Sequence, residues 1–192
     1  SPAGLPDCYA LGDYHSMLGR MLLAYKDQGR HRLARPLGRL LAEAVAGLLD
    51  GTGVTVDATS AGRSRTPPSG VVLVPVPDTP AAARARHGDH LRRLARPAAA
   101  RLRAAGIGVT LAAPLRARPR ADSTRLSAQQ RQRQAGASLA VRPAQLIGLR
   151  HRLARTGEPV ILLDDVITTG ATLAAAAGCL VAAGVPVAGA AV

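Results

Sequence analysis

Short apolar runs alternate with longer helix-forming segments along the 192-residue chain. The runs contain few polar residues and many β-branched side chains, which is typical of strands buried on both faces. The segments between them are rich in alanine, leucine and arginine and favour helices. The predicted strands are residues 71–74, 107–111, 139–141, 160–163 and 185–192, and the main predicted helices are residues 14–23, 33–49, 81–105 and 173–183. This alternation predicts an α/β fold with about five mainly parallel strands and helices on both faces of the sheet.

The segment from Pro159 to Thr172 carries the strongest chemical signal. It reads PVILLDDVITTGAT, so Asp164 and Asp165 follow directly after a predicted strand, at the end where open α/β sheets bind ligands. Residues 168–172 combine hydroxyl groups with a glycine and precede a predicted helix, whose first N–H groups and dipole favour a phosphate. The carboxylates would repel a phosphate, so we expect them to face sugar hydroxyls, a divalent metal ion or both. The implied ligand is a phosphorylated ribose.

Other interpretations of this segment fit less well. A Walker A loop requires a lysine after its final glycine, and a dinucleotide-binding turn requires three spaced glycines, but the segment has neither. The segment could also be an ordinary strand, turn and capped helix that binds nothing. Two adjacent aspartates at a strand end repel each other and lose hydration, a cost that structure alone rarely requires.

Residues Asp164 to Thr172, DDVITTGAT, resemble the phosphoribosyl-pyrophosphate (PRPP) signature of type I phosphoribosyltransferases. The chain as a whole resembles the ComF group of competence-type phosphoribosyltransferase-like proteins. The resemblance implies a type I phosphoribosyltransferase-like fold with a flexible lid loop and a small N-terminal hood over the base. It also implies that Asp164 and Asp165 are catalytic and hold magnesium indirectly. The residues that would bind PRPP are Val166, Thr168, Thr169, Gly170, Ala171 and Thr172.

A proline-rich turn follows the predicted strand 71–74. On its own the turn would be a rigid strand exit, because proline lacks an N–H donor. In the ComF group the corresponding loop faces pyrophosphate, and counting from Pro77 places Arg86 on an arginine of the family pattern. The resemblance therefore implies that pyrophosphate is bound by Pro75, Val76, Pro77 and Arg86.

Lys26 is the single lysine of a chain that otherwise uses arginine. Chance and a need for a compact ammonium group explain this position about equally well. Tyr25, Lys26 and Gly29 match a Tyr-Lys-turn-Gly pattern of the ComF group, so Lys26 is an additional site candidate. His87 and His90 are not expected to bind a metal or act in catalysis, because no paired cysteine or carboxylate motif lies near them in the sequence.

The stretch from Arg116 to Arg125 is too polar to bury. In a phosphoribosyltransferase fold, a basic loop in this place is a lid that closes over pyrophosphate and excludes water. The bidentate guanidinium group suits that task, and the resemblance makes Arg118 and Arg131 the catalytic candidates. Ser123 and Gln134 depart from the family pattern. The alternative is a disordered basic loop without a role in catalysis.

Composition narrows the expected partners. The net charge of +13 suits phosphates and pyrophosphate, while three tyrosines and no phenylalanine or tryptophan leave little aromatic surface for stacking nucleic-acid bases. Cys8 and Cys179 form no metal-ligand spacing, so no zinc site is expected. The sequence contains no long apolar run and no signal-peptide pattern, which predicts no membrane span and a cytoplasmic protein.

We expect one structural domain overall, with an N-terminal hood at 1–50, a flexible connection at 51–70 and a phosphoribosyltransferase core at 71–192. The resemblance implies transfer of a phosphoribosyl group from PRPP to a nitrogenous base, with release of pyrophosphate and with magnesium as cofactor. The alternatives are a non-catalytic PRPP-sensing or DNA-uptake accessory protein, which would contact single-stranded DNA or the uptake machinery, and a general polyanion binder. A homodimer is compatible with each of these, and the residues do not specify the acceptor base.

Overall fold

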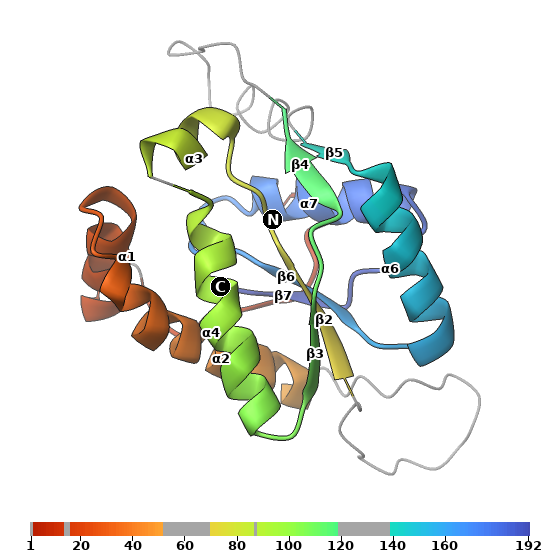
Figure 1. Ribbon diagram of the computed structural model, residues 1–192, viewed down its shortest axis with the longest axis horizontal. Coiled ribbons are helices and arrows are strands. Elements are labelled where there is room, and N and C mark those ends of the chain that lie inside the picture. The colour runs from red at the N-terminus through yellow and green to blue at the C-terminus, as the bar shows by residue number, and fades with distance from the viewer. Residues whose placement is uncertain (1, 14–15, 52–69, 87, 119–138) are drawn as a thin grey trace.

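The computed structural model describes residues 2–13, 16–51, 70–86, 88–118 and 139–192 (Figure 1). Its main sheet has five parallel strands in the order β1-β7-β6-β2-β3. A separate two-stranded antiparallel sheet pairs β4 with β5. The strands are β1 Cys8–Tyr9, β2 Gly70–Pro75, β3 Gly108–Leu111, β4 Leu115–Ala117, β5 Leu139–Val141, β6 Val160–Leu163 and β7 Gly189–Ala191. The chain is therefore an α/β protein with a mainly parallel sheet, as its hydrophobic pattern predicts.

Helices cover both faces of the main sheet (Figure 1). On one side α2 packs against β7 and α4, and α4 packs against β2 and β3; on the other side α7 packs against β6 and β5. The helices are α1 Met17–Asp27, the 3-10 helix η1 His31–Leu33, α2 Ala34–Gly51, α3 Pro80–Ala85, α4 His90–Ala104, α6 Pro143–Thr156 and α7 Ala171–Ala182. Among the described residues, no helix combines the length and the apolarity needed to cross a membrane.

Strands β2 and β6 form the centre of the core. Residues 71–74 are fully buried, and every residue of β6 is at most 2% exposed. The two strands pair in parallel with Pro75 opposite Leu163, so their carboxyl ends lie side by side. The segments that follow them, which begin at Val76 and Asp164, therefore leave the sheet at the same edge, where parallel sheets bind ligands.

The membership of the main sheet differs from the prediction. Residues 139–141 form a strand, but β5 pairs with β4 outside the main sheet, and the fifth strand of the main sheet is β1. The strand β1 has two residues, both exposed, which is too short to give a hydrophobic pattern. It is held by backbone hydrogen bonds from Ala190 to Asp7 and from Val192 to Tyr9.

The helix boundaries differ from the prediction in two places. The predicted helix 81–105 is two helices, α3 and α4, and Pro97 lies inside α4. The 14-residue helix α6 is not among the main helices predicted above. The predicted connection at 51–70 lies largely outside the described residues. Of the predicted basic lid at 116–125, residues 116–117 belong to β4, and residues 119–125 lie outside the described residues, as does Arg131.

Candidate functional site

Residues 164–173 form a small recess at the carboxyl end of β6. Asp164, the hydroxyl turn at 168–172 and Leu173 line the same recess, which has a volume of about 210 Å³. Gly170 has a φ of +74°, in the left-handed region, and precedes α7 without a side-chain cap of its own. The N–H of Ala171, the first residue of α7, donates to Thr169 Oγ1 at 3.3 Å. The N–H groups that follow it in the first turn, together with the helix dipole, favour an anion. A carboxylate and a potential phosphate cradle therefore share one recess.

Asp164 is the carboxylate of this recess. Its Oδ1 accepts a hydrogen bond of 2.9 Å from the backbone N–H of Asp165. Among the described residues, no cationic side chain forms an ion pair with it. Burial, followed by the negative charge of Asp165, raises the pKa of Asp164 to about 7. A carboxyl group with this pKa exchanges between its neutral and ionised forms near neutral pH.

Asp165 faces a different set of partners. Its Oδ2 lies 2.7 Å from Lys26 Nζ and 2.5 Å from His90 Nε2, and its side chain is 7% exposed. Burial alone would raise the pKa of Asp165, but the hydrogen bond from His90 and the charge of Lys26 outweigh burial and hold the pKa below its usual value. Asp165 is therefore an ionised carboxylate buried against two cationic groups.

His90 lies between two carboxylates at the beginning of α4. Its Nε2 contacts Asp165, its Nδ1 contacts Asp78, and its backbone carbonyl accepts a hydrogen bond of 2.7 Å from the Tyr25 hydroxyl. Burial alone would lower the pKa of His90, but the hydrogen bonds with Asp165 and Asp78 raise it to about 9. With a carboxylate at each ring nitrogen, His90 is an imidazolium at neutral pH.

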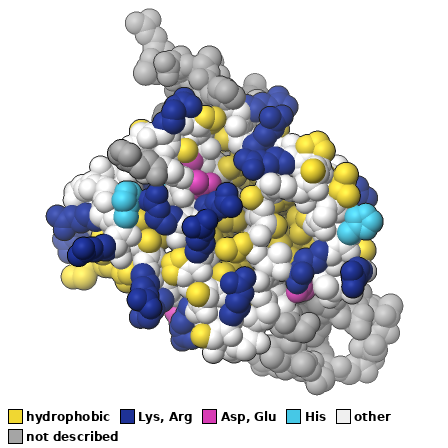
Figure 2. Space-filling view, in the orientation of Figure 1, with side chains coloured by type: hydrophobic (Ala, Val, Ile, Leu, Met, Phe, Trp, Pro, Cys, Tyr) yellow, Lys and Arg dark blue, Asp and Glu magenta, His cyan; other side chains and the backbone are white. Residues whose placement is uncertain are grey.

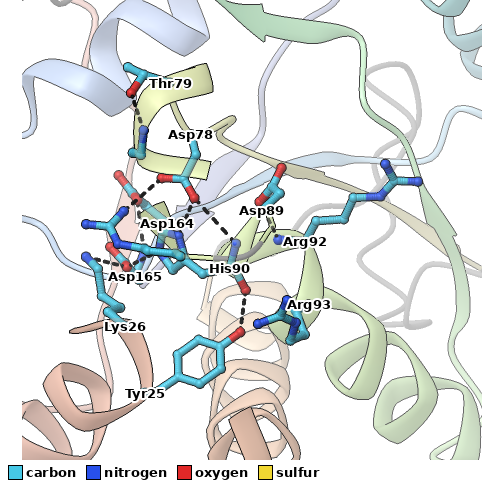
Figure 3. A network of polar contacts seen from close by, with 12 residues as sticks. Tyr25, Lys26, Asp78, Thr79, Asp89, His90, Arg92, Arg93, Asp164 and Asp165 are labelled. Carbon is cyan, nitrogen blue, oxygen red and sulfur yellow. Dashed lines mark hydrogen bonds and ion pairs between the residues drawn. The ribbon is translucent and has the colours of Figure 1, made fainter. Parts of the chain in front are cut away.

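Asp78, the second carboxylate that contacts His90, also pairs with an arginine. Its Oδ1 accepts a hydrogen bond of 3.2 Å from Arg86, which also lies 3.9 Å from Asp27. We call the set of Lys26, Asp78, Arg86, His90 and Asp165 the Asp165 network (Figure 3). Its positive and negative groups alternate, so each buried charge has an opposite neighbour, as buried charges require.

The Asp165 network joins three regions that are distant in sequence, around residue 26, residues 78–90 and residue 165. Lys26 comes from the last turn of α1, His90 from the first turn of α4, and Asp165 from the β6–α7 connection. The β2–α3 connection and the end of α3 supply Asp78 and Arg86. The network therefore holds the loop after β2 against the loop after β6.

An apolar pocket of about 390 Å³ opens beside the same acid pair. Its lining consists mainly of leucines from α1, α2 and α4, with Asp164 and Asp165 at one end. Helices α1 and α2 belong to the predicted hood, so the structure brings residues of the first 50 positions next to the strand tip.

The structure brings some of the predicted site residues together. Asp164 and residues 166–172 line one recess, and Lys26 contacts Asp165 directly. Arg86 lies next to the site but is paired with Asp78 and Asp27. Arg118 is exposed after β4, and no contact between it and the Asp165 network is present among the described residues.

The Pro75-Val76-Pro77 turn lies next to the Asp165 network but offers few hydrogen-bond donors. The prolines have no N–H group, and the N–H of Val76 donates to Leu163 at 3.0 Å. The Val76 side chain is 5% exposed. The turn therefore presents carbonyl groups and apolar surface to its surroundings, and cationic side chains must supply most of the attraction for a pyrophosphate bound nearby.

Sequence reasoning missed two members of the Asp165 network, His90 and Asp78. No carboxylate motif lies near His90 in the sequence, but the fold supplies carboxylates from positions 78 and 165. Asp78 carried a usable signal, because it closely follows a predicted buried strand, as Asp164 does. Nothing in the local sequence indicates that His90 reaches both.

The described residues contain no group of three or more His, Cys, Asp or Glu side chains arranged to hold a metal ion. Asp78 and Asp165 are already paired with cationic groups. Asp164 is thus the carboxylate at the strand tip that remains open to a hydrated cation or to hydroxyl groups. No protein-family model and no curated protein sequence match the chain.

Proposed function

We propose that this chain is a PRPP-binding, type I phosphoribosyltransferase-like protein similar to the ComF group. It would transfer a phosphoribosyl group from PRPP to a nitrogenous base and release pyrophosphate. The observation that carries the proposal is the shared recess: Asp164 and the hydroxyl turn lie together at the carboxyl end of the central strand β6. A carboxylate beside an anion cradle matches a ligand that has hydroxyl groups near a phosphate.

The 5′-phosphate of PRPP would occupy the hydroxyl turn. The threonine hydroxyls and the first N–H groups of α7 are the donors there. Gly170 keeps the turn in a left-handed conformation, which L-residues with a side chain adopt at a cost. Asp164, which has no cationic partner among the described residues, would accept hydrogen bonds from the ribose hydroxyls.

The Asp165 network would stabilise the positive charge that develops on the ribose ring during transfer. Loss of pyrophosphate leaves positive charge on the ribose ring, and a nearby fixed carboxylate stabilises that charge. Lys26 and His90 keep Asp165 ionised and hold it in position. Lys26 is the more exposed of the two partners, with a side chain 20% exposed against 8% for His90. Its ammonium group would therefore also attract a phosphate oxygen of PRPP while it stays paired with Asp165.

Magnesium would arrive as part of the Mg²⁺–PRPP complex. When bound, it would supply positive charge that neutralises the pyrophosphate leaving group. Asp164 fits this role through water, since its carboxylate is not engaged by a cation. The other carboxylates of the site already have cationic partners.

A second candidate function is PRPP binding without turnover, in a sensing or DNA-uptake accessory role. Two observations favour it. Asp165 is already neutralised by Lys26 and His90, and residues 75–77 offer no free N–H donor to pyrophosphate. Both candidates require the same recess, and they differ in whether pyrophosphate is released.

Calorimetry with magnesium and PRPP tests the binding shared by both candidates. We expect Asp164→Asn to weaken binding by about tenfold or more, because a hydrogen bond to a charged group contributes about 1.5–3 kcal/mol. Asp50→Asn, at an exposed position near the end of α2, is the matched control and should bind as the wild type does. Absence of PRPP binding by the wild type, or unchanged binding by Asp164→Asn, would overturn the proposal.

Pyrophosphate release, measured across a panel of purine and pyrimidine bases, separates the two candidates. Release with one base identifies a transferase and its acceptor. Binding of PRPP without release for any base supports the accessory role.

A further inference from the structure

A second recess lies on the other flank of the Pro75–Pro77 turn. It has a volume of about 630 Å³, is open to solvent, and is formed between α4, the end of β3, β4 and the start of α6. It shares no residue with the Asp165 network or with the recess at the hydroxyl turn, but it includes Pro75 and Pro77 of the turn that the family resemblance assigns to pyrophosphate. Figure 3 shows Arg92 extending away from His90, on the side opposite Lys26.

Three arginines line this second recess, Arg92, Arg96 and Arg142, together with one carboxylate, Asp89. Arg92 and Arg96 are one helical turn apart on α4, so their positive charges repel each other. Among the described residues, no carboxylate forms an ion pair with any of the three guanidinium groups. Asp89 is occupied as the N-cap of α4, where it accepts a hydrogen bond of 2.9 Å from the Arg92 backbone N–H. The recess therefore carries an excess of positive charge that the described residues do not neutralise.

The other residues that line the recess are apolar, and backbone hydrogen bonds fix the segments that carry them. It includes Pro75, Pro77, Leu111 and Leu115. The N–H of Ala112 donates to Leu73 at 3.0 Å, and the N–H of Arg142 donates to Pro114 at 2.7 Å. Because these bonds fix both the aliphatic wall and the start of α6, the recess is largely preformed.

We propose that this second recess, which we call the arginine recess, binds an organic diphosphate whose organic part carries a ring. The guanidinium groups would hold the phosphates through bidentate hydrogen bonds, and the aliphatic wall would cover an apolar ring. An inorganic anion would leave that wall exposed. A nucleic-acid strand fits less well, because none of the described lining residues is aromatic and bases would have nothing on which to stack. Lys and Arg side chains are spread widely over this face of the molecule (Figure 2), but the recess combines them with a shaped apolar wall.

Calorimetry with ADP as the probe tests this inference. We expect ADP to bind at least about tenfold more tightly than inorganic pyrophosphate or adenosine, because only ADP engages both the arginines and the wall. The double variant Arg92→Gln, Arg96→Gln should weaken ADP binding by about tenfold or more. Both positions are exposed, so the fold should be retained, and circular dichroism checks this. Arg155→Gln, exposed at the opposite end of α6 from Arg142, is the matched control and should bind ADP normally.

The variant Asp164→Asn distinguishes this inference from the proposed function. Asp164→Asn should retain ADP binding even if it loses PRPP binding. Loss of ADP binding in Asp164→Asn would place ADP in the recess at the hydroxyl turn and overturn the inference. ADP binding no tighter than that of pyrophosphate, unchanged binding by the double arginine variant, or tighter binding of a short single-stranded oligonucleotide than of ADP would also overturn it.

Discussion

Asp164 and Asp165 are neighbours in sequence but have different chemical environments. Asp164 faces the hydroxyl turn without a cationic partner among the described residues, and burial raises its pKa to about 7. Asp165 contacts Lys26 and His90, which hold its pKa below the usual value against the effect of burial. Paired acids with separated pKa values can take different roles in one site. Under the proposed function, Asp164 would bind the hydroxyl groups and Asp165 would stabilise the developing charge.

The titration of Asp164 predicts how PRPP binding depends on pH. A carboxylate accepts hydrogen bonds from ribose hydroxyls better than a neutral carboxyl group does, and Asp164 ionises as the pH rises through about 7. We expect the affinity for Mg²⁺–PRPP to rise between about pH 6 and pH 8. The PRPP phosphates also titrate near pH 6, so Asp164→Asn provides the reference. Calorimetric pH profiles of equal slope for the wild type and this variant would contradict the prediction.

The titration of His90 predicts how stability depends on pH. The pKa of His90 is about 9 in the folded protein, against 6.5 for an unperturbed histidine. The folded state thus binds the extra proton between these values. The stabilising contribution is complete below about pH 6.5 and is lost as the pH rises through about 9. We expect the unfolding free energy of the wild type to fall by about 1–3 kcal/mol across this window.

Urea unfolding of the wild type and His90→Gln at several pH values measures this effect. The fall between about pH 6.5 and 9 should be smaller in the variant, because glutamine does not titrate. An equal fall in both proteins would show that His90 does not hold an extra proton in the folded state.

At the scale of elements, the contact between α2 and α4 depends on a glycine. A Cβ atom on Gly38 would lie 2.6 Å from the carbonyl oxygen of Leu94 and would also meet the ring of Pro97. The close approach of the two helices places Leu37 and Leu41 against the same pocket as Leu94. It also allows α4 to present His90 at the carboxyl edge of the sheet.

We expect Gly38→Ala to lower the unfolding free energy by about 1–3 kcal/mol, because the added methyl group overpacks the helix contact. The control is Gly148→Ala in α6, where a Cβ atom would meet nothing within 4 Å. That substitution should be neutral or stabilise by up to about 1 kcal/mol, since alanine is the better helix former. Urea unfolding measures both, and equal effects would show that the helices separate without cost.

At the scale of the whole molecule, ion pairs link the layers of the fold. Lys26–Asp165 joins α1 to the tip of the central strand and is largely buried, with side chains 20% and 7% exposed. Arg101–Glu43 joins α4 to α2 and is about half exposed, with side chains 46% and 53% exposed. Charges that lose hydration interact strongly, whereas exposed pairs are screened by water.

Double-mutant cycles compare the two links. For Lys26→Met with Asp165→Asn, we expect a coupling energy of about 1–3 kcal/mol in urea unfolding. For Arg101→Met with Glu43→Gln, we expect about 0–0.5 kcal/mol. A Lys26–Asp165 coupling no larger than the Arg101–Glu43 coupling would mean that the buried pair does not hold α1 against the sheet.

The sequence by itself determined the features that depend on neighbouring residues. Continuous apolar runs predicted the central strands β2 and β6, and the order of residues placed two carboxylates directly after β6, ahead of a helix-forming segment. These features are local, because strand burial, turn chemistry and helix propensity act over a few positions.

Only the tertiary structure decided which distant groups meet. The pairing of Asp165 with Lys26 and His90, the insertion of β1 at the edge of the main sheet and the convergence of three arginines in one recess all join residues far apart in the chain. Such contacts depend on the register of the strands and on the packing of helices across them, and a single sequence shows neither. The separation of Asp164 and Asp165 into two environments follows for the same physical reason: burial and charged neighbours, supplied by the fold, set the ionisation of each carboxyl group.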